Sequence, residues 1–161
     1  MIRNRIRTTT ACMAAAAIVA GGATGLAHGA GTASADYNRS FPLSQCFGLS
    51  PNIIDVPFAP PGINVTQYDG FTTLLVTFSS LWLGVGYVSD ATLTWKHLDN
   101  GKHGTMRSHG VAKPPNTGTL GFGFPRNEPG KGRVKLTLSA VNSNGLWSIP
   151  TNSCTATINI P

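Results

Sequence analysis

The sequence predicts an all-β fold, an antiparallel β-sandwich of two sheets and about seven strands that is tied by one disulfide. After residue 35 short segments alternate apolar and polar residues, and no apolar period of 3.6 residues persists over ten residues. Turn residues separate these segments at short intervals, since the 161 residues include 19 glycines and 11 prolines. A charged fraction of only 11% excludes a coiled coil and a charge-rich disordered chain. An up-and-down barrel is the alternative arrangement of the same strands.

Residues 1–35 are predicted to be a cleaved signal peptide. A basic start is followed by an apolar run over 11–20 and an Ala-x-Ala site that ends at Ala35. The basic residues are Arg3, Arg5 and Arg7. About ten apolar residues are too few to cross a bilayer, which takes about 20. We expect cleavage after Ala35, with cleavage after Gly29 and an uncleaved anchor as alternatives. Residues 36–161 are then a secreted domain, extracellular or envelope-associated, with no transmembrane segment.

The charge of that domain is modest. Without residues 1–35 the chain keeps nine basic residues against six acidic ones, a net charge of +3. Dispersed charge of this size disfavours nucleic-acid binding, which needs clustered Lys and Arg. Four basic residues are predicted on the solvent side of their strands, as an ordinary soluble surface or, alternatively, as a salt-sensitive basic face. These residues are Lys96, Arg107, Arg133 and Lys135.

Cys46 and Cys154 are predicted to form a disulfide. They are the two cysteines of the exported domain, so only one pairing exists. The loop between them is roughly 100 residues long, for which the chain-entropy model gives a stabilisation of about 4.7 kcal/mol. The alternative is a pair of unrelated buried thiols. The sequence contains no C-x-x-C motif, and we expect no metal site and no cofactor.

The first part of the domain, residues 36–61, is rich in proline. Because proline confines strands to sheet edges, we expect one or two short edge strands here, with 52–56 as the candidate, and otherwise loop. The first strong strand is predicted over 71–79, where Leu74, Val76 and Phe78 share one face.

A β-hairpin is predicted from 91–98 and 102–109, which flank Asn100-Gly101. A two-residue type I′ turn at Asn100-Gly101 places Trp95 opposite Met106 and Leu98 opposite His103. In this register Trp95 anchors the core, and His97 lies on its face while His103 lies on the other.

Three more strands complete the predicted sheets. In 117–124 the apolar side chains share one face, and Gly121 and Gly123 form the other, either as a bend or as a flat surface for a strand or a sugar ring. Segments 133–142 and 154–160 alternate strictly. The residues predicted to point inward are Leu120, Phe122, Phe124, Val134, Leu136, Leu138, Ala140, Cys154, Ala156, Ile158 and Ile160.

Several of these features together resemble small secreted Ig-like proteins of actinobacteria. They are the Arg/Ala-rich start, the hairpin Trp95-x-x-Leu98-Asp99-Asn100-Gly101-x-x-Gly104, the turn Pro129-Gly130-x-Gly132 and the late Cys154. The resemblance covers most of residues 36–161 and implies an Ig-like sandwich of bacterial origin. It assigns no functional residue.

The segment 81–87 is the principal candidate for function. Its seven residues carry no charge, and exposed apolar patches usually mean contact. The predicted contact residues are Leu81, Trp82, Leu83 and Tyr87. The alternative is that the segment continues the core as a strand. The favoured function is a non-enzymatic binding module that uses this loop or an exposed sheet edge to contact an unknown protein, glycan or envelope component.

Two other functions remain as alternatives. One is a carrier of a small apolar ligand, with a cavity between the sheets. The other is a small secreted hydrolase that uses His97, His103 or His109. His103 and His109 are six residues apart on one strand, about 20 Å, so they cannot share a metal ion. No G-x-S-x-G motif is present, and we assign no catalytic residue.

Overall fold

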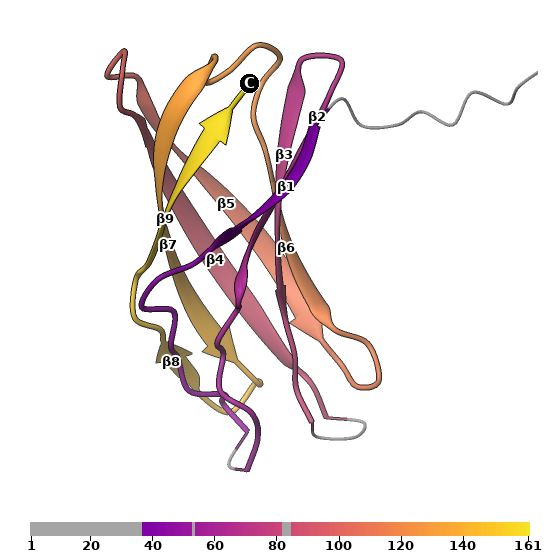
Figure 1. Cartoon of the computed structure of the whole chain (residues 1–161). Coiled ribbons are helices and arrows are strands. Elements are labelled where there is room, and N and C mark those ends of the chain that lie inside the picture. The colour runs from indigo at the N-terminus through magenta and orange to yellow at the C-terminus, as the bar shows by residue number, and fades with distance from the viewer. Residues whose placement is uncertain (1–36, 53, 82–84) are drawn as a thin grey trace, which may run out of the picture. The chain divides into compact units, whose positions relative to one another are not determined.

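A computed structural model describes residues 37–52, 54–81 and 85–161, and residues Ala33–Pro161 form one compact unit (Figure 1). The predicted signal peptide lies outside the described residues. Within them the fold is all-β, with nine strands. These are β1 (Tyr37–Pro42), β2 (Gly62–Tyr68), β3 (Phe71–Phe78), β4 (Tyr87–His97), β5 (His103–Ala112), β6 (Gly118–Gly123), β7 (Gly132–Ser143), β8 (Ser148–Pro150) and β9 (Cys154–Ile160).

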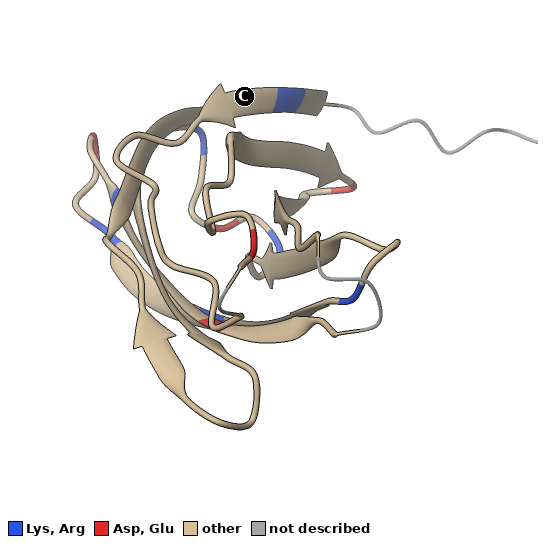
Figure 2. Ribbon diagram, turned by 90° about the horizontal axis from the view of Figure 1, so that it is seen from below, with Lys and Arg blue, Asp and Glu red and all other residues tan. Residues whose placement is uncertain are grey.

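Two antiparallel sheets pack face to face, which confirms the predicted sandwich. One sheet has the order β1-β2-β3-β6, and the other the order β5-β4-β7-β8, with β9 also beside β7. Each long strand alternates buried and exposed residues because one face meets the opposite sheet. Viewed along the strands, the two sheets curve around a common interior (Figure 2).

The outer strands of the two sheets meet at two seams. At one seam Ser44, just after β1, exchanges backbone hydrogen bonds of 2.8 and 3.0 Å with Thr155 in β9. At the other seam the Gly121 N–H of β6 donates to the Ser108 hydroxyl of β5 at 2.9 Å. At these seams an edge of one sheet lies next to an edge of the other, although among the described residues no continuous ladder joins them as in a barrel.

The core follows the predicted pattern. The inward-facing residues of β6, β7 and β9 are buried as expected, and 22 buried hydrophobic side chains lie in the core. Trp95 is 8% exposed and meets Phe124 edge to face, with ring centroids 5.3 Å apart. These side chains occupy the space that a ligand carrier would need between its sheets.

The predicted register of the β4–β5 hairpin is wrong by two residues. Trp95 lies opposite Gly104 and Leu93 opposite Met106, because the connection is a loop over 98–101 in which only Gly101 has a positive φ. The buried imidazole of His97 shapes this loop. Its Nδ1 accepts the backbone N–H groups of Asp99 and Asn100 (3.2 and 3.3 Å), and its Nε2 bonds the Lys131 carbonyl (2.9 Å). A shift of two residues keeps every side chain on its predicted face.

The region before β3 differs most from the prediction. Residues 52 and 54–56 form no strand. The edge strand expected in this region is β1 instead, and β2 is a strand that was not predicted from the sequence. β2 and β3 are joined by Asp69-Gly70, whose φ values of 46° and 77° fit a type I′ turn.

The predicted Cys46–Cys154 disulfide is present. It joins the loop 43–61 to the first residue of β9, and the two Cα atoms are 4.5 Å apart. In the same loop Gly48 and Phe58 exchange two backbone hydrogen bonds of 2.8 Å, and the Phe58 ring is fully buried. The long proline-rich loop is therefore fixed to the sandwich at several points.

Candidate functional site

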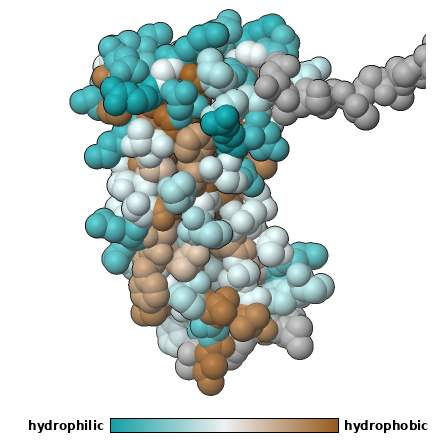
Figure 3. Space-filling view, in the orientation of Figure 1, coloured by the Kyte–Doolittle hydropathy of each residue, from teal (hydrophilic) through white to brown (hydrophobic). Residues whose placement is uncertain are grey.

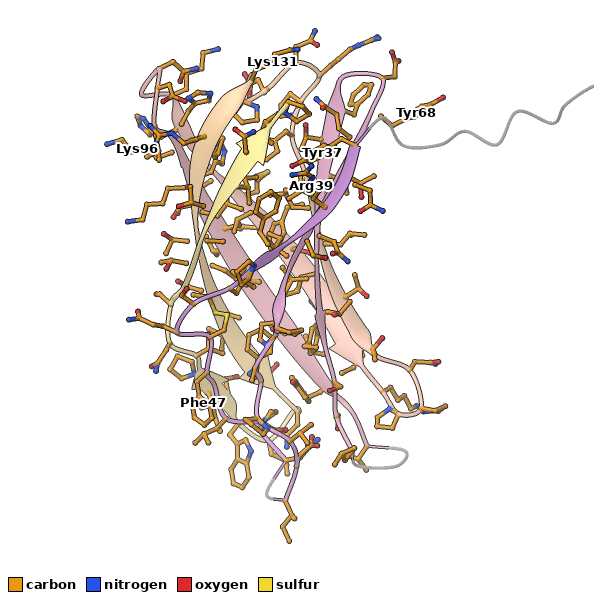
Figure 4. All side chains as sticks on the ribbon, viewed as in Figure 1. Tyr37, Arg39, Phe47, Tyr68, Lys96 and Lys131 are labelled. Carbon is orange, nitrogen blue, oxygen red and sulfur yellow. A yellow bond between two sulfur atoms is a disulfide. The ribbon has the colours of Figure 1, made fainter. Side chains whose placement is uncertain are left out.

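Exposed apolar side chains gather at one end of the sandwich. Among the described residues 13 large hydrophobic ones are exposed, and seven of these lie on three loops, 43–61, 79–86 and 144–147. They are Phe47, Leu49, Ile54, Leu81, Val85, Leu146 and Trp147, and we call this set the apolar tip. In Figure 3 hydrophobic residues are prominent at the lower end and hydrophilic ones at the upper end. Figure 4 places Phe47 at the lower end and Lys131 and Tyr68 toward the upper end.

The single charged residue of the three loops, Asp55, links two of them. Its carboxylate accepts the Ser80 hydroxyl (2.6 Å), the Leu81 N–H (2.7 Å) and the Ser50 hydroxyl (2.9 Å). Partial burial raises the pKa of this carboxyl, but the hydrogen bonds outweigh it and hold the pKa below its usual value. Asp55 therefore fixes the loop 79–86 against the loop 43–61.

Amide and indole groups attach the third loop. The Asn144 side chain donates to the Pro51 carbonyl at 2.8 Å, and the indole N–H of Trp147 donates to the same oxygen. The Asn52 amide donates to Asp55 (3.2 Å) and to the Val85 carbonyl (3.5 Å). The apolar tip thus projects from loops whose polar side chains are bonded to one another. A hollow of about 410 Å³ lies between Phe47, Leu49 and Trp147.

The structure divides the predicted contact residues. Leu81 is 70% exposed and belongs to the apolar tip, whereas Trp82 and Leu83 lie outside the described residues. Tyr87 is only 2% exposed, and its hydroxyl donates to the Ser79 carbonyl at 3.3 Å. Burial, and secondarily the charge of Asp55, raises the pKa of the Tyr87 phenol. Tyr87 is a core residue, so its assignment to a contact surface is corrected.

Gly86 also has an internal role. A Cβ atom at this position would lie 1.8 Å from the Ala112 carbonyl oxygen. The glycine therefore lets the chain approach its own backbone at the start of β4.

Five residues of the apolar tip were not predicted. Phe47, Leu49 and Ile54 come from the proline-rich segment, which was interpreted as loop and edge strand. Leu146 and Trp147 directly follow the Asn144-Gly145 turn. Two adjacent large apolar residues in a tight connection were the signal available in the sequence.

The other predicted contact mode is an exposed sheet edge, and two pairs of edge strands lie next to each other. β1 meets β9 and β6 meets β5 at the seams described above. Gly121 and Gly123 face outward in an unbroken register opposite Leu75 and Thr73, so they form no bulge. Their flat face remains open, since a Cβ at Gly123 would meet no atom within 4 Å.

The three histidines lie apart. His97 is buried in the hairpin, while His109 pairs with Asp90 at 2.7 Å on the exposed face of the sheet. Ser108 precedes His109 in sequence, and its hydroxyl accepts the Gly121 N–H at the seam. Its side chain therefore lies on the other face of β5 from that of His109. Among the described residues no group of three His, Cys, Asp or Glu side chains is placed to hold a metal ion.

A row of basic side chains crosses the outer face of the second sheet. Lys96 lies opposite His103 on one neighbouring strand and opposite Lys135 on the other. The ion pairs among the described residues involve other cations, including Arg133, which bonds Asp99 at 3.3 Å. The backbone N–H of Arg133 also donates to the Asp99 carboxylate, and this hydrogen bond holds the pKa of Asp99 below its usual value. Like charges directly opposite each other on a sheet are unfavourable, and no carboxylate of the described residues forms an ion pair with Lys96 or Lys135.

Lys135→Glu is expected to stabilise the fold by about 1 kcal/mol at low salt, because it replaces this repulsion with a cross-strand ion pair to Lys96. Urea unfolding at low and high salt measures the gain, which should shrink as salt screens it. Lys135→Gln, which only removes the repulsion, should give a smaller gain. Equal stability of wild type and Lys135→Glu at low salt would show that the two side chains do not interact.

Comparison with known protein families, curated proteins and solved structures finds no match for this chain. Within the described residues no helix is long and apolar enough to cross a membrane. The fold and the site define the class of the protein as a small disulfide-bonded β-sandwich that presents an apolar loop end.

Proposed function

We propose that this chain is an exported, non-enzymatic binding module that contacts its partner through the apolar tip. The observation that carries the proposal is the concentration of seven exposed hydrophobic side chains at one end of the sandwich. A fully buried Leu, Ile or Phe side chain contributes about 1.5–3 kcal/mol relative to exposure in water. Several such side chains together offset the entropy cost of association.

The rigidity of the loops supports this function. The Asp55 carboxylate and the Asn144 amide bond the three loops to one another, and the disulfide holds the longest of them to β9. A surface that is ordered before binding loses less conformational entropy when the partner arrives. The apolar tip is therefore preorganised for contact.

Export is part of the proposal. It is supported by the predicted signal peptide over 1–35 and by the disulfide, which forms and persists in oxidising compartments. The resemblance to small secreted Ig-like proteins of actinobacteria agrees with it. The partner is then a component of the cell envelope or of the surrounding medium.

Co-sedimentation with the producer's envelope fraction tests the proposal. Residues 33–161, with the disulfide formed, are expected to be retained at both low and high salt. Leu81→Ser combined with Leu146→Ser removes two apolar side chains that are 70% and 83% exposed. We expect it to weaken retention by about 3 kcal/mol, a factor of about 100.

The matched control combines Tyr68→Ser with Leu98→Ser, because these side chains are also exposed but lie at the end of β2 and just after β4, at the other end of the sandwich, where Figure 4 labels Tyr68. It should leave retention unchanged. Unaltered retention of the tip variant, or equal loss in both variants, would contradict the proposal. Wild-type retention that disappears at high salt would instead assign the contact to the basic row at Lys96 and Lys135.

A further inference from the structure

We infer that the apolar tip inserts into the hydrocarbon of a lipid layer, so that the protein docks on a lipid surface through the ends of its loops. This inference rests on the proposed function and names the partner. Three properties of the described residues carry it: the internal bonding of the polar groups at the tip, the protruding position of its side chains, and the distribution of charge along the sandwich.

Several polar side chains of the three loops are bonded within the tip. The Asp55 carboxylate, the Asn52 and Asn144 amides and the Trp147 indole N–H are all bonded within the three loops. A protein–protein interface typically carries about ten direct hydrogen bonds. Hydrocarbon offers no hydrogen-bonding partner, so polar groups there must be satisfied internally. The bonding at the apolar tip fits hydrocarbon better than a polar partner surface.

The most exposed side chains of the tip protrude from three different loops. Ile54 is 77% exposed, Leu81 70% and Leu146 83%. Each lies in a connection between strands at the same end of the sandwich (Figure 1). A rigid protein partner must offer a complementary hollow for every protruding side chain, whereas a lipid layer deforms around them.

Charge is distributed unequally between the two ends. At the tip Asp55 is bonded internally, and the adjacent loop 113–117 adds one exposed cation, Lys113, beside Val85 and Gly145. The opposite end carries the pairs Asp69–Arg126 and Asp99–Arg133. Binding at a membrane interface is strengthened by buried apolar area and by attraction of cations to anionic lipids, and the tip with Lys113 offers both. Lys113 is placed to meet anionic headgroups when the tip is inserted.

Binding to protein-free vesicles tests the inference. Residues 33–161, with the full chain in parallel, are floated with vesicles of phosphatidylcholine alone or mixed with phosphatidylglycerol. We expect binding to both kinds, with higher affinity for the mixed vesicles. Leu81→Ser combined with Leu146→Ser should weaken binding by about a hundredfold, since both side chains enter the hydrocarbon.

Lys113→Gln should weaken binding about fivefold on the mixed vesicles only, because it removes a charge and no apolar surface. The Tyr68→Ser, Leu98→Ser control should bind as the wild type does. Thermal unfolding of every variant shows whether it is folded, and the tip variant is expected to match the wild type because its two side chains are exposed.

Two results separate the inference from the proposed function. Failure of the wild type to bind either kind of vesicle, with envelope retention still lost in the tip variant, would overturn the lipid inference and leave a protein or glycan partner. Envelope retention that does not depend on the tip would remove the proposed function and the inference with it. Vesicle binding that the tip variant keeps would also overturn the inference.

Discussion

Replacing Cys46 and Cys154 with alanine is expected to lower the free energy of unfolding by about 4 kcal/mol. The two residues are 108 positions apart, so the bond restrains most of the domain when the chain is unfolded. Alanine is the appropriate substitute because Cys154 is fully buried, and a serine hydroxyl there would add a desolvation cost. Urea unfolding of residues 33–161 with and without the bond measures the difference.

Reduction of the wild-type protein provides the control for this prediction. Reduced wild type and the alanine variant should unfold at similar urea concentrations, since both lack the same restraint. A loss below about 1 kcal/mol would mean that the unfolded chain gains little freedom when the bond is absent. In that case the Gly48–Phe58 hydrogen bonds and the Phe58 ring hold the loop 43–61 largely by themselves.

The strands that the sequence predicts well are those in which one face is buried along the whole length. β7 and β9 alternate without interruption, so burial and periodicity give the same answer. β1 has no such alternation, because it lies at a seam and its residues are mostly exposed. The Asp69-Gly70 dipeptide favours a two-residue hairpin turn. Together with the strand predicted after it, this turn also indicates β2.

The register error in the β4–β5 hairpin has a different origin. Asn100-Gly101 favours a two-residue turn when only the local sequence is considered. The observed loop is longer because the buried imidazole of His97 accepts two of its N–H groups and bonds Lys131, a residue 34 positions away in sequence. A tertiary contact of this kind overrides the local turn preference and is not visible in the hairpin sequence.

The apolar tip was predictable only in part. The uncharged segment 81–87 indicates one of its loops, but the tip is formed by three loops that are far apart in the sequence. Their association depends on hydrogen bonds from the Leu81 N–H to Asp55 and from the Asn144 amide to Pro51, which span 26 and 93 positions. Sequence pattern identifies exposed apolar residues one loop at a time. It does not show which loops meet at the same end of a sandwich.

Asp55→Asn is expected to destabilise the protein by about 2 kcal/mol near neutral pH, because a carboxylate that accepts several hydrogen bonds is replaced by an amide whose N–H₂ group opposes their donors. The effect should depend on pH. The pKa of Asp55 in the folded protein is below its usual value, so its contribution is complete above the unfolded pKa and is lost as the pH falls through the folded one. Urea unfolding from about pH 7 to about pH 3 should therefore show the gap between wild type and variant closing in acid.

Asp69→Asn is the matched control for that experiment. Its carboxylate forms an exposed ion pair with Arg126 at 2.8 Å, for which we expect a loss of at most about 1 kcal/mol. Asp55→Asn should also weaken envelope retention and vesicle binding at neutral pH, since the loops 43–61 and 79–86 are no longer held together, whereas Asp69→Asn should alter neither. A gap between wild type and Asp55→Asn that stays constant down to about pH 3 would show that the Asp55 carboxylate does not hold the loops. The preorganisation of the apolar tip would then have to come from the Asn52 hydrogen bond to Val85 and from the Asn144 and Trp147 contacts with Pro51.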